Sequence, residues 1–81
     1  MAEMKQFGID VALDETVAQG HYSNLAIISH TTTEFIIDFA TLLPGVSKAH
    51  VKSRIILTPE HAKRLLRSLQ DNIVPVSYTH L

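Results

Sequence analysis

The stretch that decides the fold is Thr58-Pro-Glu-His-Ala-Lys-Arg-Leu-Leu-Arg-Ser-Leu-Gln-Asp-Asn-Ile73. Its apolar residues recur every three or four positions, so they form one stripe along a helix. This apolar stripe consists of Ala62, Leu65, Leu66, Leu69 and Ile73. Thr58 suits the cap position before a helix, and Pro59 suits the first helical position. Because proline interrupts helical hydrogen bonding, Pro75 predicts that the helix ends near Ile73.

Four segments before this helix have the patterns of β-strands. Ile9–Leu13, Glu34–Thr41 and Lys48–Leu57 place residues of different character on alternating faces, as half-buried strands do. Tyr22–His30 is apolar on both faces, which suggests a central strand. The sequence therefore predicts an α+β fold: a four-stranded antiparallel β-meander followed by one C-terminal amphipathic helix packed on one sheet face.

The last two predicted strands can be aligned by their faces. If Phe35, Ile37 and Phe39 face the core, their partners are Val51, Ser53 and Ile55, so odd-numbered residues pair with odd-numbered residues. This alignment predicts that Asp38 lies opposite or diagonal to Lys52 and that Glu34 lies near Arg54. It also requires a connection of roughly three or five residues around Pro44-Gly45.

Composition limits the classes of protein to consider. The 81 residues carry a net charge of −1 and include no cysteine, which excludes disulfide scaffolds, thiolate metal sites and cysteine nucleophiles. No apolar run reaches the roughly 18 residues of a membrane span, and the near-neutral charge disfavours a strongly basic nucleic-acid binder. The first residues show no signal-peptide pattern, so we expect a cytoplasmic protein and no membrane partner. A domain this small has a small core that supplies little stability. We therefore expect self-association, with a dimer favoured, to supply additional stability.

Several segments match one family pattern: Ser53–Ile73, Tyr22–Leu25, Ile28–His30, Glu34–Phe39 and Leu43–Gly45. Together they resemble a family of short bacterial proteins of unknown function, common in Bacteroidetes. The resemblance covers most of the chain between Ile9 and Ile73. It implies no activity, cofactor or binding residue.

The resemblance stops at the C-terminus. Family members tend to continue the helix after Asn72-Ile73 and to finish with Tyr-Glu, whereas this chain continues as Val74-Pro-Val-Ser-Tyr-Thr-His-Leu81. This segment resembles translated adapter or vector sequence attached to a truncated reading frame, and the alternative is a genuine short tail. We therefore expect a single α+β domain at residues 7–73 and an atypical tail at residues 74–81.

Basic residues alternate along the last predicted strand. They are Lys48, His50, Lys52 and Arg54. On a regular strand they share one face, and such a stripe could follow the phosphates of a nucleic acid. The alternative is a solvated strand face that pairs with Glu34 and Asp38 and protects a sheet edge from aggregation.

The junction between this strand and the helix is a second candidate site. Amides in the first turn of a helix lack internal partners and can bind an anion. Thr58 and His61 lie at this corner together with Arg54, and they complete the candidate anion or nucleic-acid contacts. The alternative is that the Thr58 hydroxyl, the Glu60 side chain and water satisfy the helix end.

Catalytic and metal-binding patterns do not stand out in this sequence. The histidines lack metal-ligand spacing, although His30 and His50 could meet across strands, and the serines lack a nucleophile elbow. We therefore expect no enzyme activity, no cofactor and no metal. The favoured function is a small non-enzymatic interaction module that self-associates or binds another protein. The alternative is weak nucleic-acid or anion binding through Lys48–Arg54 and the helix N-terminus.

Overall fold

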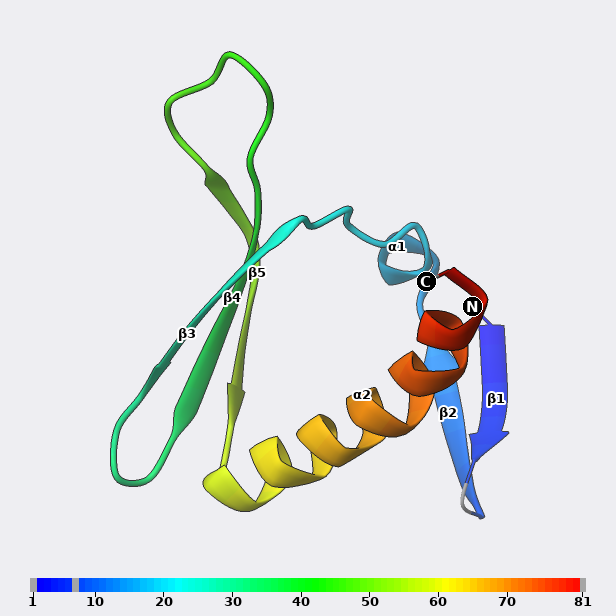
Figure 1. Ribbon diagram of the computed structural model, residues 1–81. Coiled ribbons are helices and arrows are strands. Elements are labelled where there is room, and N and C mark those ends of the chain that lie inside the picture. The colour runs from blue at the N-terminus through cyan, green and yellow to red at the C-terminus, as the bar shows by residue number, and fades with distance from the viewer. Residues whose placement is uncertain (1, 7, 81) are drawn as a thin grey trace.

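The computed structural model describes the backbone of residues 2–6 and 8–80 and the side chains of residues 8–74. The elements follow one another as β1 (Ala2–Gln6), β2 (Ile9–Leu13), α1 (Glu15–Ala18), β3 (Leu25–His30), β4 (Phe35–Thr41), β5 (His50–Leu57) and α2 (Pro59–His80) (Figure 1). The α+β class and the C-terminal helix predicted from the sequence are confirmed.

The main sheet consists of β3, β4 and β5, with β4 at its centre and both neighbours antiparallel to it. Ile28 of β3 and Ile55 of β5 both lie opposite Ile37 of β4, so apolar residues share one face. The predicted pairing of odd-numbered residues of β4 with odd-numbered residues of β5 is confirmed from Phe35 to Phe39, but the partners are Leu57, Ile55 and Ser53, two residues further along β5 than predicted. The hydrophobic pattern therefore sets which faces pair over this part of the sheet.

A β-bulge interrupts the pairing of β4 with β5. Phe39 pairs with Ser53, whereas Ala40 pairs with Val51. Lys52 is therefore an extra residue between the two pairs. An extra residue reverses the alternation of side chains along the bulged strand. On a regular strand, every second residue shares one face. Because of the extra residue, a residue before Lys52 and a residue after it that would have shared a face now lie on opposite faces.

The connection between β4 and β5 contains the predicted turn but is longer than predicted. The Val46 N–H donates to the Leu43 C=O at 3.2 Å, and Gly45 has a φ of 77°, which a residue with a Cβ rarely adopts. The connection runs over residues 42–49. The prediction of roughly three or five residues is wrong because the pairing of β4 with β5 stops at Thr41 and His50, well before the turn at Gly45.

The predicted four-stranded meander is also wrong. Its first strand exists as β2, but β2 pairs with β1 in a separate two-stranded hairpin. Gly8, with a φ of 75°, lies in the turn between these strands. The Asp14 side chain then accepts the Thr16 N–H at 2.9 Å and caps α1. The chain therefore leaves β2 through a helical turn and does not return beside it as β3.

Side-chain hydrogen bonds attach the chain to the sheet just before β3, which begins later than predicted, at Leu25. The Ser23 hydroxyl donates to the Ala40 C=O at 2.9 Å. The Asn24 side chain donates to the Leu42 C=O and accepts the Leu42 N–H, each at 2.9 Å. These bonds take the place of strand pairing, because an amide side chain offers both a donor and an acceptor.

The first turn of α2 has the cap that the sequence predicts. Thr58 Oγ1 accepts the His61 N–H at 3.2 Å, and the Thr58 C=O accepts the Ala62 N–H at 2.9 Å. The hydroxyl thus satisfies one of the amides that the helix itself leaves without a partner.

Substitution at this cap has a predictable cost. Thr58→Ala is expected to lower the free energy of unfolding by about 1 kcal/mol, because it leaves the His61 amide without its protein acceptor. Thr58→Ser keeps the hydroxyl and is expected to remain close to wild type. Urea unfolding followed by circular dichroism measures both variants. Equal losses in the two variants, or no loss in Thr58→Ala, would contradict the cap.

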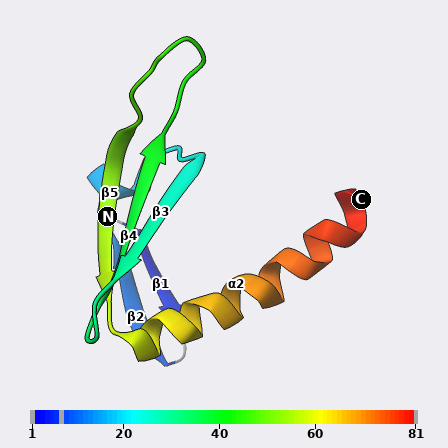
Figure 2. The same cartoon turned by 60° about the vertical axis from the view of Figure 1, so that its left-hand side comes forward.

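The helix α2 begins at the end of β5 and runs away from the sheet (Figure 1, Figure 2). It continues through Pro75 to His80, so the predicted end near Ile73 is wrong. A proline inside a helix removes one backbone donor, and here the helix extends on both sides of that position. The predicted packing of the helix on one sheet face is limited to its N-terminal half.

The molecule has an open shape and a small core. Its radius of gyration is 15.5 Å, whereas a compact chain of this length has about 12 Å. Within residues 8–74, only Ile37 and Ala40 are buried, with 7% and 0% of their surface exposed. Most of the apolar residues on which the sequence predictions rest are therefore in contact with water in the single chain.

Candidate functional site

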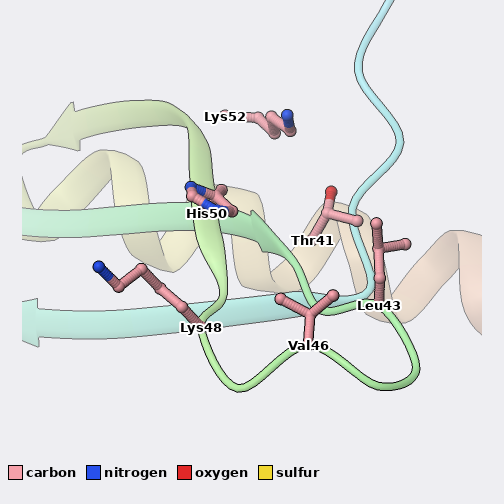
Figure 3. Close-up of a pocket in the computed structure, with 6 residues that line it drawn as sticks. All are labelled: Thr41, Leu43, Val46, Lys48, His50 and Lys52. Carbon is pink, nitrogen blue, oxygen red and sulfur yellow. The ribbon is translucent and has the colours of Figure 1, made fainter.

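Three of the four predicted basic residues surround a small pocket where β4 ends and β5 begins (Figure 3). The pocket, here called the basic pocket, is lined by Thr41, Leu43, Val46, Lys48, His50 and Lys52. Its volume is about 60 Å³, enough for a few water molecules or one small ion. Its lining includes two lysines, a histidine and a threonine hydroxyl beside the apolar side chains of Leu43 and Val46, and it contains no carboxylate. This chemistry suits a small anion better than a cation.

The fourth basic residue, Arg54, does not belong to this pocket. Its Nε and Nη2 atoms donate to Asp38 Oδ1 at 2.7 Å and to Asp38 Oδ2 at 2.9 Å. The two side chains form a bidentate ion pair between β4 and β5. These bonds lower the pKa of the Asp38 carboxyl, and the same bonds raise the pKa of Arg54. The prediction of one continuous basic stripe is wrong, because the bulge at Lys52 places Arg54 and His50 on opposite faces.

The helix corner lies at the other end of β5. Thr58 and His61 follow this strand, whereas the basic pocket lies at its beginning. Six residues of extended chain between Lys52 and Thr58 span roughly 20 Å. A small anion therefore cannot contact both places, and the Thr58 hydroxyl is already used by the His61 amide.

His30 and His50 do not come together. His30 pairs with Phe35 at one end of β4, while His50 pairs with Thr41 at the other end, so the suggested meeting of His30 and His50 is wrong. The ring of His30 stacks on that of Phe35, with centroids 5.2 Å apart. Across the described part of the chain, no three histidine, aspartate or glutamate residues form a group that could hold a metal ion.

A larger surface feature lies between α2 and the sheet, and we call it the apolar groove. It is lined by Ile28, Phe35, Ile37, Ala62, Leu65, Leu66 and Leu69, and its volume is about 250 Å³. All of these side chains are hydrocarbon. A second hollow of about 170 Å³ adjoins the groove at Leu66, on the side toward the N-terminus of the helix. Pro59 and Lys63 also line it. The groove can therefore accept apolar side chains but offers no polar group to orient a small substrate.

The exposure of the apolar stripe shows that the single chain leaves this groove open. Leu66, Leu69 and Ile73 have 57%, 48% and 54% of their surface exposed. Sequence reasoning predicted that the stripe is covered by the sheet and so missed the groove. The signal was the length of the stripe, which continues along the helix after the sheet has ended. Ile27 on the opposite sheet face is also half exposed.

The fold and these surfaces define a small α+β protein with an apolar groove between its helix and its sheet. The chain belongs to the family described as "Protein of unknown function (DUF3467)", whose family model matches residues 1–80. This match confirms the resemblance to a family of unknown function. No curated protein matches the chain, and no solved structure matches it. Among the described helices, none has the length and hydrophobicity to cross a membrane.

Proposed function

We propose that the chain is a non-enzymatic interaction module of the cytoplasm that self-associates through the apolar groove and stripe. The observation that carries this proposal is the open groove lined by hydrocarbon side chains from both helix and sheet. Soluble proteins rarely leave contiguous apolar surface exposed, and such a surface typically marks an interaction site. The groove is suited to the side chains of another protein, because it has no polar group on which a substrate could be activated.

The size of the core supports the same proposal. Only Ile37 and Ala40 are buried within residues 8–74, and the sequence has no cysteine to replace a core with disulfides. Small domains with so little buried surface are normally stabilised by disulfides, metals or association. Association that buries the apolar stripe would stabilise the folded chain by mass action.

Sedimentation equilibrium at micromolar concentration tests the proposal. The expected result is a mass of twice the 9.0 kDa of one chain, falling toward one chain on dilution. A mass of one chain at every concentration up to hundreds of micromolar would refute self-association. A mass above one chain that does not change when the groove is altered would place the association elsewhere.

The basic pocket supports a second candidate function, the binding of a phosphate group of a nucleic acid or of a free anion. The observation that favours it is that Lys48, His50 and Lys52 all line one pocket that has no carboxylate. Phosphate contacts release counterions, so the affinity would fall with salt concentration.

This second candidate predicts a specific salt dependence. Binding of labelled DNA or RNA to the wild type, measured by fluorescence anisotropy, is expected to weaken with a logarithmic salt slope of about −2 if two lysines contact phosphates. Lys52→Ala is expected to reduce this slope by about one. Arg67→Ala removes the same charge from an exposed helix position and serves as the matched control. Absence of binding at low salt, or equal effects of the two variants, would refute a site at the basic pocket.

A further inference from the structure

Four of the five residues of the apolar stripe have a spacing that is the same in both directions along α2, while the fifth, Leu65, has Gln70 at its mirror position. Ala62, Leu66, Leu69 and Ile73 are separated by four, three and four residues. When two helices pack antiparallel, each meets the residues of the other in reverse order. A stripe with reversible spacing therefore matches itself, as required at an interface between identical subunits related by a two-fold axis.

Both halves of α2 leave apolar surface exposed, one beside the sheet and one beyond it. The N-terminal half, with Ala62 and Leu65, lines the apolar groove beside the sheet, and the groove has no occupant in the single chain. The C-terminal half extends beyond the sheet (Figure 1, Figure 2), and Ile73 there is 54% exposed. An antiparallel partner places its C-terminal half beside the N-terminal half of the first helix. In this arrangement the C-terminal half of each α2 fills the apolar groove of the other copy. The same contact covers the C-terminal half, here called the overhanging half because it extends beyond the sheet.

We infer that two copies of this chain pair their α2 helices antiparallel, with the two-fold axis between Leu66 and Leu69. Leu69 and Ile73 of each copy then enter the apolar groove of the other copy. This inference rests on the proposed self-association and specifies the partner and the surface that it uses.

Apart from Lys63, which lines the second hollow beside the groove, the charged residues of α2 lie away from the surface used in this pairing. At 100° per residue, Arg64, Arg67 and Asp71 lie on the side of the helix opposite the apolar stripe. Arg64 Nη2 donates to Glu60 Oε1 at 2.8 Å on that side, and both side chains are mostly exposed. Pairing through the stripe therefore buries none of these charges.

The accessible surface of the chain is large enough for such an interface. It is 7237 Å², whereas a compact protein of this mass exposes about 4,900 Å². The excess is about 2,300 Å², and each subunit of an obligate homodimer buries roughly 1,000–2,500 Å². The groove and the overhanging half of α2 both contribute to this excess. A second copy can therefore cover the surface that one chain leaves exposed.

Cross-linking between introduced cysteines tests the helix arrangement. The natural chain has no cysteine, so Ala62→Cys and Ile73→Cys each introduce the only thiol. One of the two variants carries an affinity tag, and the chains are mixed, allowed to exchange and treated with a short bis-maleimide. In the inferred arrangement residue 62 of one copy faces residue 73 of the other, whereas two copies of residue 73 are about 16 Å apart along the helix axis. The expected product is a cross-link between the two variants and none within either alone.

Each alternative outcome of this experiment has a definite meaning. Cross-linking of Ile73→Cys with itself would indicate parallel helices and would overturn the inference. A sample with the mass of two chains but no mixed cross-link would also overturn it, while leaving self-association in place. A sample with the mass of one chain would overturn both the inference and the proposed function.

A matched pair of substitutions provides an independent measurement. Leu69→Asp is expected to raise the dissociation constant of the pair at least about 30-fold, because it places a carboxylate in the partner's groove. Leu42→Asp changes a leucine of nearly equal exposure, 46% against 48%, in the connection between β4 and β5. It is expected to leave the constant unchanged. Equal effects of both variants, with far-ultraviolet circular dichroism confirming the fold, would contradict a role for the groove.

Discussion

Leu66→Ala is expected to lower the free energy of unfolding by about 2–4 kcal/mol at protein concentrations at which the copies associate, and by about 1 kcal/mol or less at high dilution. The difference follows from the environment of this side chain. In the single chain Leu66 lines the apolar groove but remains 57% exposed, so its truncation removes little buried surface. In the associated state the side chain is enclosed, and truncation leaves a cavity.

Urea unfolding at two protein concentrations separates the loss of stability in the single chain from the additional loss in the associated state. Leu43→Ala is the matched control, because Leu43 has a similar exposure of 56% but lines the basic pocket. Its cost is expected to be small and independent of concentration. A loss in Leu66→Ala that is the same at both concentrations would show that the burial of Leu66 does not depend on a second copy.

Ile37→Ala is expected to cost about 2–4 kcal/mol at every protein concentration. Ile37 lies in the central strand, pairs with Ile28 and Ile55, and is only 7% exposed within the single chain. Total stabilities of small domains are typically about 5 kcal/mol, so the variant is expected to be largely unfolded at physiological temperature.

Thermal unfolding followed by circular dichroism measures this effect. Ile27→Ala is the control, because Ile27 is the neighbouring residue of Ile28 on β3 and is 49% exposed on the opposite sheet face. Its cost is expected to be about 1 kcal/mol or less. If both variants lose the same stability, Ile37 is not the centre of the core.

Local features of the chain were predictable because they depend on short segments. Thr58 and Pro59 predict the start of α2 from the chemistry of helix ends, and the structure has the helix beginning at Pro59. The face shared by Phe35, Ile37 and Phe39 predicts that odd-numbered residues of β4 pair with odd-numbered residues of β5, because a shift by one residue would expose that face.

Features that depend on irregular or distant pairing were not predictable in the same way. A bulge such as that at Lys52 has no required residue type, and it moves Arg54 out of the basic stripe. The pairing of β2 with β1 depends on Ala2–Gln6, where the alternation of Ala2 and Met4 with Glu3 and Lys5 is too short to identify a strand. The helix beyond Pro75 shows that one missing hydrogen bond does not decide where a helix ends.

The candidate site was predictable in its residue types but not in its geometry. Lys48, His50 and Lys52 do line one pocket, yet their separation from Thr58 follows from the extended length of β5. The apolar groove was missed because a stripe at helical spacing is normally covered by the same chain. Whether one chain can cover it depends on the angle at which α2 leaves the sheet, and no local residue pattern encodes that angle.

The open shape of the chain has a consequence for its hydrodynamic behaviour. A compact protein of twice this length has a radius of gyration of about 15 Å, and the single chain already has 15.5 Å. Two chains that close around each other would double the mass while the molecular dimensions hardly change. Association would thus raise the density of the particle and its sedimentation rate, but it would leave the elution volume on gel filtration nearly constant.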